Sequence, residues 1–136
     1  ALGARVILFG PEEFISEGGW LPGVETCHDF DSRLSELDAV QVLRIEHERI
    51  EGGMALSVQE YVDRFQLNED RLAKCGPEMC VLHPGPMNRG VEISDAVADG
   101  PQSRILQQVA AGVPVRMALL ERALGNQRDS GHGDRH

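Results

Sequence analysis

Two short segments of this 136-residue sequence carry residues that could bind a charged or amide-bearing ligand. The first is the charged run 44–49 (RIEHER), which begins at Arg44 directly after an apolar run at residues 39–43. An arginine in this place can clamp a carboxylate or a phosphate through two parallel hydrogen bonds. The alternative is a solvated charged loop with internal ion pairs, because charged runs usually lie at a protein surface.

The second segment is the stretch 82–90 (LHPGPMNRG), which follows an apolar run at residues 79–82. Because Pro84 and Pro86 flank Gly85, we expect a rigid, extended backbone that a ligand can approach closely. Proline has no amide hydrogen, so this stretch chiefly offers carbonyl oxygens and suits a ligand with N–H donors rather than a phosphate. A stiff turn that binds nothing is the alternative.

Strands that alternate with helices must position these segments. The apolar runs 5–9, 39–43 and 79–82 do not alternate with polar residues, which is typical of strands buried on both faces of a parallel sheet, and a weaker strand is expected at 24–27. The sequence therefore predicts an α/β fold, with an open, mostly parallel sheet flanked by helices. Such sheets bind ligands at the carboxyl ends of their strands, where both segments lie.

Helix signals fall between and after these strands. Helices are expected at residues 31–37 with Asp31 or Ser32 as the cap, after the capping box 57–60, from the capping residue Asn68 towards 74, and over 105–112. Gly112 should end the last of these, and Pro114 should begin a final helix because its missing amide costs little in a first turn.

Composition limits the partners and the compartment. The sequence has 13 basic and 22 acidic residues, and the resulting net charge of -9 argues against nucleic acid or an anionic membrane as the main partner. Three cysteines, an odd number, indicate reduced thiols in a cytoplasmic protein. Cys75, Cys80 and His83 have a loosely metal-like spacing but no fourth ligand, so no metal site is predicted.

The chain reads as one domain over residues 1–125, followed by a polar tail over 126–136 that we expect to be disordered. The first residue is Ala1 rather than methionine, which suggests that the sequence begins within a longer chain.

Nearly the whole sequence resembles one enzyme family. Residues 82–99 (LHPGPMNRGVEISDAVAD) and the stretch SRILQQVAAGVPVRMALL from Ser103 resemble the carboxyl-terminal signature of bacterial aspartate carbamoyltransferase. Residues 43–49 (LRIEHER) resemble the LRxQxER loop of that family, and the opening LGARVILFGP is similar to the first strand of its aspartate-binding domain. The resemblance covers all but the tail, and its His-Pro-Gly-Pro stretch is highly specific.

This resemblance implies a Rossmann-like half of a transcarbamoylase, an enzyme of de novo pyrimidine synthesis. Such enzymes transfer the carbamoyl group of carbamoyl phosphate to L-aspartate, and give N-carbamoyl-L-aspartate and phosphate without a metal or an organic cofactor. Their active sites lie between the subunits of a homotrimer. The resemblance assigns a substrate carboxylate to Arg44 and the carbamoyl amide to the main-chain oxygens around Gly85 and Pro86. The substrate-binding positions are thus Arg44, Glu46, Pro84, Gly85 and Pro86.

Two departures from the family pattern limit what this chain can do alone. Glu48 and Arg49 match positions that hold two domains closed, yet the Ser-Thr-Arg-Thr motif of the phosphate-binding amino-terminal domain is absent from this sequence. We therefore assign no catalytic residue to this half and expect no turnover from it alone. The second departure is Glu46, which stands where the family has glutamine. An ionised carboxylate only accepts hydrogen bonds and repels a dianionic substrate.

Two other functions stay open at this stage. One is a non-catalytic, transcarbamoylase-like subunit that binds a partner chain or an amino acid, which Glu46 and the missing motif favour. The other is a sister transcarbamoylase that acts on another amino acid. Arg44 favours an acidic side chain in the substrate. Pro84 stands where ornithine-type enzymes, by resemblance, have a cysteine.

The Glu46 departure gives a first prediction. In a complete enzyme, Glu46→Gln should lower the KM for aspartate, because it restores a neutral hydrogen-bond donor and removes a repelling charge. Steady-state kinetics with varied aspartate measure this effect. An unchanged KM would show that Glu46 does not affect amino-acid binding.

Overall fold

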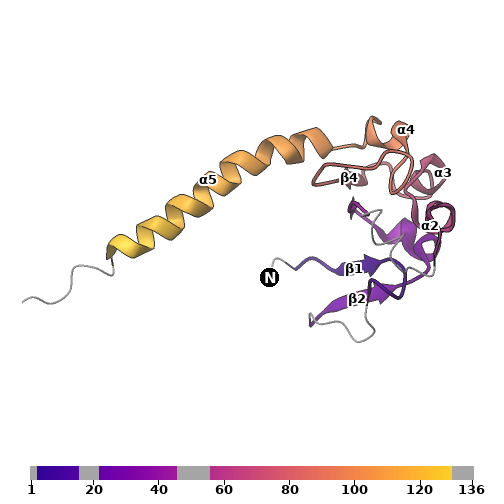
Figure 1. Ribbon diagram of the computed structural model, residues 1–136, viewed down its shortest axis with the longest axis horizontal. Helices are drawn as coiled ribbons and strands as arrows, with labels where there is room; N and C mark the ends of the chain where they lie inside the picture. Colours follow the sequence, from indigo (N-terminus) through magenta and orange to yellow (C-terminus); the bar gives the residue numbers. More distant parts are fainter. Residues whose placement is uncertain (1–2, 16–21, 46–55, 130–136) are drawn as a thin grey trace, which may run out of the picture.

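The computed structural model describes residues 3–15, 22–45 and 56–129. Its strands pair in parallel, β1 (Val6–Phe9) with β2 (Val24–Cys27) and β3 (Ala39–Gln41) with β4 (Cys80–Leu82). Short helices lie beside these strands, and one long helix extends from the rest of the molecule (Figure 1). The predicted α/β class, with parallel strands flanked by helices, is confirmed, and hydrogen bonding divides the strands into two pairs.

The strands are less buried than their apolar sequences predict. In β4, Val81 is fully buried, whereas β1, β2 and β3 contain no fully buried residue and Val6 is 44% exposed. The expectation of strands buried on both faces, made for the apolar runs 5–9 and 39–43, is therefore wrong for β1 and β3. The core gathers around β4 instead, and its largest side chains include Leu34, Phe65, Leu67 and Met79.

The segment after β2 forms a 3-10 helix, η1 (Phe30–Glu36), rather than a helix capped by Asp31 or Ser32. The Ser32 hydroxyl donates to the Asp29 carbonyl at 2.8 Å, and the Asp31 carboxylate accepts from Arg71 and from Lys74, each at 2.8 Å. The two predicted caps thus have other partners, one of them 40 residues away in the sequence.

The next helices begin where the sequence predicts. At α2 (Val58–Phe65), the Ser57 amide donates to the Glu60 carboxylate at 2.8 Å, and the Glu60 amide donates to the Ser57 hydroxyl at 3.2 Å. Asn68 caps α3 (Glu69–Leu72) by accepting from the Arg71 amide at 3.0 Å, but the helix stops short of residue 74. The short helix α4 (Asp95–Ala98), which Ser94 caps, was not predicted.

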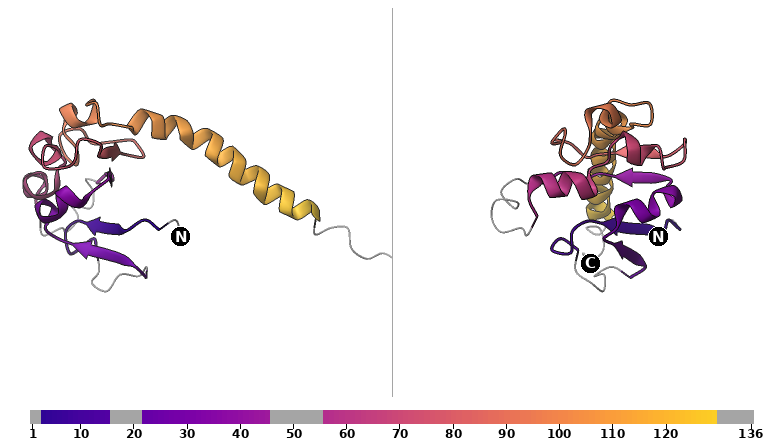
Figure 2. Two further views of the ribbon diagram at one scale, coloured as in Figure 1. Left: turned by 180° about the vertical axis from the view of Figure 1, so that it is seen from behind. Right: turned by 90° about the vertical axis from the view of Figure 1, so that its right-hand side faces the viewer.

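A single helix, α5 (Ile105–Asp129), replaces the two helices expected around Gly112 and Pro114. Proline removes one helical hydrogen bond, but its fixed φ is helical, so it does not by itself end a helix. The helix projects away from the strands (Figures 1 and 2). It ends at Asp129, within the range 126–136 of the predicted tail. The division into a domain and a tail stays a prediction. In the described parts of the chain, α5 included, we find no helix whose length and apolar content suit a membrane span.

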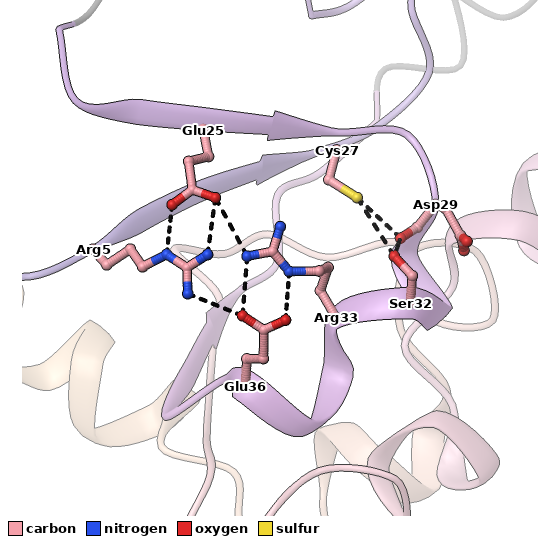
Figure 3. Close-up of polar contacts among 7 residues, drawn as sticks. All are labelled: Arg5, Glu25, Cys27, Asp29, Ser32, Arg33 and Glu36. Atoms are coloured by element: carbon pink, nitrogen blue, oxygen red, sulfur yellow. Dashed lines mark hydrogen bonds and ion pairs between the residues drawn. The ribbon is translucent and has the colours of Figure 1, made fainter.

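Four charged side chains join β1, β2 and η1 at the surface (Figure 3). Arg5 donates to Glu25 at 2.9 Å and to Glu36 at 2.9 Å, and Arg33 donates to the same two carboxylates at 3.3 and 2.6 Å. The hydrogen bonds from Arg5 lower the pKa of the Glu25 carboxyl to about 2, and those from Arg33 chiefly lower the pKa of Glu36. This network holds η1 against the edge of the β1–β2 pair.

The network predicts how stability depends on pH. A carboxylate whose pKa is lower in the folded than in the unfolded chain stabilises the fold above its ordinary value, here 4.5, and this stabilisation is lost as the pH falls towards 2. Urea denaturation between pH 5 and pH 2, followed through NMR signals of core residues, should therefore show a smaller acid-induced loss for Glu25→Gln than for the wild type. Glu78→Gln is the control, since Glu78 forms no ion pair with the described residues. Identical pH profiles for all three proteins would contradict the prediction.

Candidate functional site

The parallel pairing of β3 with β4 brings the two candidate segments to one edge. Gln41 pairs with Leu82 in the ladder, and the Val42 amide extends the pairing by donating to the Leu82 carbonyl at 2.8 Å. Arg44 follows Gln41 by three residues, and Gly85 follows Leu82 by three residues. The pairing therefore places the starts of both segments at the carboxyl ends of neighbouring parallel strands.

One side chain ties the two segments together. Asn88 donates from Nδ2 to the carbonyl oxygen of Ile45 at 2.7 Å. Ile45 is buried, whereas the adjacent Arg44 is exposed and makes no ion pair with the described residues. The backbone beside Arg44 is thus anchored while its guanidinium is open to solvent.

The loop after β4 is bent rather than extended. Gly85 has a φ of +65°, and the Gly85–Pro86 peptide bond is cis, so the expectation of an extended backbone is wrong at Gly85. The cause is the left-handed conformation, which glycine adopts without steric cost. Within the described residues, the carbonyl oxygens of Pro84, Gly85 and Pro86 accept no hydrogen bond. The predicted surplus of acceptors is therefore present.

A buried polar pair supports this loop from below. The side chains of His83 and Glu92 are both 0% exposed, with 3.2 Å between Nε2 and Oε1. His83 Nδ1 accepts from the Gly85 amide at 2.9 Å, and Glu92 Oε1 accepts from the Asn88 amide at 2.6 Å. The sequence alone places His83 in the stretch 82–90 and in a loosely metal-like spacing, and it predicts no role for Glu92. Nothing local marks them, because their pairing depends on how the intervening loop folds.

The first turn of α5 also holds this edge. The His83 amide donates to Gln108 Oε1 at 2.9 Å, and Gln108 Nε2 donates to Gln41 Oε1 at 3.0 Å. A β-carbon on Gly85 would lie 3.9 Å from Val109 of α5. The side chain of Gln108 therefore joins the start of α5 to β3 and to the residue that follows β4.

Electrostatic and steric features around the site are modest. Burial, with a smaller effect of the Glu92 charge, raises the pKa of Tyr61 to about 12. Two shallow hollows, of about 260 and 320 Å³, are lined by residues other than Arg44 and 84–86. Three predicted site residues, Glu46, Glu48 and Arg49, lie outside the described residues.

An arginine lies at the carboxyl end of one strand, and a loop whose carbonyl oxygens accept no hydrogen bond from the described residues follows the neighbouring parallel strand. This arrangement is typical of a ligand-binding α/β domain. Comparison with known families makes this class specific. Residues 12–123 match the Asp/Orn binding domain of aspartate/ornithine carbamoyltransferase. The chain belongs to this family.

Curated relatives agree with this assignment. The chain is 48% identical over 116 residues to the aspartate carbamoyltransferase catalytic subunit of Stenotrophomonas maltophilia, a match that covers 85% of this chain and 37% of that protein. It is 50% identical over 121 residues to the corresponding subunit of Beijerinckia indica, covering 89% of this chain and 38% of that protein. The chain therefore spans less than two fifths of the length of either relative.

Solved structures share the fold. Ornithine carbamoyltransferase from Burkholderia thailandensis aligns with a TM-score of 0.68 at 19% identity, over 86% of this chain and 38% of that one. Aspartate transcarbamoylase from Trypanosoma cruzi in complex with carbamoyl phosphate aligns with a TM-score of 0.60 at 26% identity, over 71% of this chain and 30% of that one. The first likeness concerns the fold alone.

The bend at Gly85 gives a third prediction. Gly85→Ala should lower the free energy of unfolding by roughly 1–2 kcal/mol relative to Gly76→Ala, because a left-handed residue with a β-carbon is strained. Gly76 is the matched control, since it has no positive φ and a β-carbon there would meet nothing within 4 Å. Urea denaturation of the core measures the difference, and equal effects of the two substitutions would refute the strain at Gly85.

Proposed function

We propose that this chain is the aspartate-binding part of an aspartate carbamoyltransferase that acts in de novo pyrimidine synthesis, in the cytoplasm. Its substrates would be carbamoyl phosphate and L-aspartate. Support comes from the names of the curated relatives and from Trypanosoma cruzi aspartate transcarbamoylase, which is 26% identical and was solved in complex with carbamoyl aspartate and phosphate.

The observation that carries the proposal is the shared register of Arg44 and Gly85 at the ends of β3 and β4. The Arg44 guanidinium can hold a carboxylate of aspartate in two-point geometry. The carbonyl oxygens of Pro84, Gly85 and Pro86, which accept no hydrogen bond from the described residues, suit the NH2 group of a carbamoyl group, which donates but does not accept. One edge therefore offers groups for both reactants.

In this reaction the aspartate amino nitrogen attacks the carbamoyl carbon. A C–N bond forms, the bond from carbon to the phosphate oxygen breaks, and the nitrogen loses a proton. The protein's contribution is to position the two reactants and to stabilise charge, without a covalent intermediate or a cofactor. The chain supplies the aspartate side, Glu46 included. Phosphate-binding groups would come from the rest of the enzyme, with Glu48 and Arg49 stabilising the closed arrangement.

Helix α5 supports the proposal that a further domain belongs to the working enzyme. Six apolar residues recur along it at intervals of three or four and are each at least half exposed, so they form one stripe. These are Leu106, Val109, Val113, Met117, Leu120 and Leu124. A stripe of this length normally packs against another surface. We infer that it packs on the amino-terminal domain, in an enzyme that assembles as a homotrimer.

A second candidate function is a non-catalytic subunit that binds an amino acid or a partner chain. Glu46 favours it, because a carboxylate in place of the family's glutamine weakens the attraction for aspartate. The two candidates differ in turnover once the rest of an enzyme is present. Ornithine as the substrate is disfavoured by Arg44, whose charge complements an acidic side chain.

A fusion protein tests the proposed function. The part of the Stenotrophomonas maltophilia catalytic subunit that this chain does not match is joined to this chain, and the formation of carbamoyl aspartate is assayed. We expect turnover from the fusion protein and none from the chain alone. Arg44→Lys should lower kcat/KM for aspartate about tenfold or more, since lysine keeps the charge but loses the bidentate geometry.

Arg33→Lys is the matched control. Arg33 is a surface arginine of the β1–β2 ion-pair network, and its substitution should leave turnover unchanged. A folded fusion protein without activity would refute the proposed function and favour the non-catalytic subunit. Equal losses for Arg33→Lys and Arg44→Lys would refute the role of Arg44.

A further inference from the structure

The buried pair below the loop determines which nitrogen of the His83 ring carries a proton. The Gly85 amide donates to Nδ1 at 2.9 Å, so Nδ1 has to present a lone pair. A neutral imidazole with an unprotonated Nδ1 carries its proton on Nε2. Nε2 lies 3.2 Å from Glu92 Oε1 and therefore donates to it. Both ring nitrogens are thus assigned by their partners.

Glu92 in turn links this ring to the rest of the loop. Its Oε1 also accepts from the Asn88 amide at 2.6 Å, while Oε2 is buried without a partner among the described residues. Asn88 continues the chain of contacts to the Ile45 carbonyl, next to Arg44. Half-buried Tyr61 is one ionisable group near Glu92, since the Glu92 charge contributes to the raised pKa of Tyr61. A connected set of hydrogen bonds therefore runs from the loop after β4 to the segment after β3.

The bond to Nδ1 has a directional consequence for the loop. In a trans peptide group the N–H and C=O bonds point in opposite directions. The Gly85 N–H points to the buried His83 ring, so the carbonyl of the same peptide group, that of Pro84, points away from it. The Pro84 carbonyl accepts no hydrogen bond from the described residues, and Pro84 itself is exposed.

We propose that His83 is a positioning residue, which acts through its bare Nδ1 to aim the Pro84 carbonyl oxygen at the NH2 group of the carbamoyl substrate. This inference rests on the proposed function and adds to it the group that orients the acceptor. Glu92 holds the required tautomer by accepting from Nε2. His83 itself does not touch the substrate.

Two substitutions at His83 separate its two hydrogen bonds. In His83→Asn, the amide oxygen occupies the place of Nδ1 and still accepts from the Gly85 amide, while the donor to Glu92 is lost. In His83→Gln, the side-chain amide reaches the place of Nε2 and still donates to Glu92, while the acceptor for Gly85 is lost. Both variants lose ring packing, so the comparison between them isolates the bond to Gly85. Glu92→Gln is a further control, because its Oε1 can still accept.

Ring protonation is measured first, on the chain itself. A long-range ¹H–¹⁵N spectrum of the wild type should show His83 with a protonated Nε2 and a bare Nδ1, and Glu92→Gln should keep this pattern. A proton on Nδ1 overturns the proposal, whatever the stability of the variants.

Function is measured in the active fusion protein. We expect His83→Gln to raise the KM for carbamoyl phosphate by about tenfold, the effect of one lost acceptor, with a smaller change in kcat and with His83→Asn close to the wild type. Equal KM changes in the two variants overturn the proposal and show that His83 only stabilises the fold. In that case, turnover by the fusion protein without substitutions leaves the proposed function intact. A wild-type fusion protein without turnover refutes the proposed function and, with it, the substrate role of the loop.

Discussion

The site depends on one constraint, the parallel pairing of β3 with β4. Parallel strands end at the same edge of a sheet. Backbone pairing therefore makes neighbours of Gln41 and Leu82, which are 41 positions apart in the sequence. The pairing continues through the Val42 amide, and side-chain hydrogen bonds of Asn88 and Gln108 strengthen it on either side. Arg44 and the carbonyl oxygens after β4 thus lie on a backbone that is held from several directions, which is what substrate positioning requires.

Buried polarity at this edge serves orientation more than stability. A buried carboxylate with one oxygen unpartnered among the described residues costs free energy, roughly 1–3 kcal/mol for an unsatisfied group. An apolar pair could fill the space below the loop, but it could not accept hydrogen bonds from the amides of Gly85 and Asn88. Retaining His83 and Glu92 is therefore reasonable where the direction of peptide groups matters.

Local signals in the sequence predicted local structure well. The capping box at Ser57 and the cap at Asn68 involve partners three residues away, and both formed as expected. Features that depend on distant partners were not predictable in this way. Asp31 pairs with Arg71 rather than capping η1, and the bend at Gly85 follows from the left-handed conformation that the folded loop imposes. The strand before Arg44 could be predicted because its apolar run is a local signal, whereas the His83–Glu92 pair depends on the folded loop.

The projection of α5 links the folding of this helix thermodynamically to the assembly that we propose. Among the residues of α5 whose burial is described, only the first, Ile105, belongs to the core, and helices gain most of their stability from tertiary packing rather than from propensity. Interior glycine and proline weaken α5 further as an independent helix. Melting of α5 is thus expected to be a local event, separate from the unfolding of the core, until its apolar stripe is covered. The interface that covers the stripe would then supply the free energy that orders the helix. The fraction of α5 that is helical would therefore rise as the enzyme assembles.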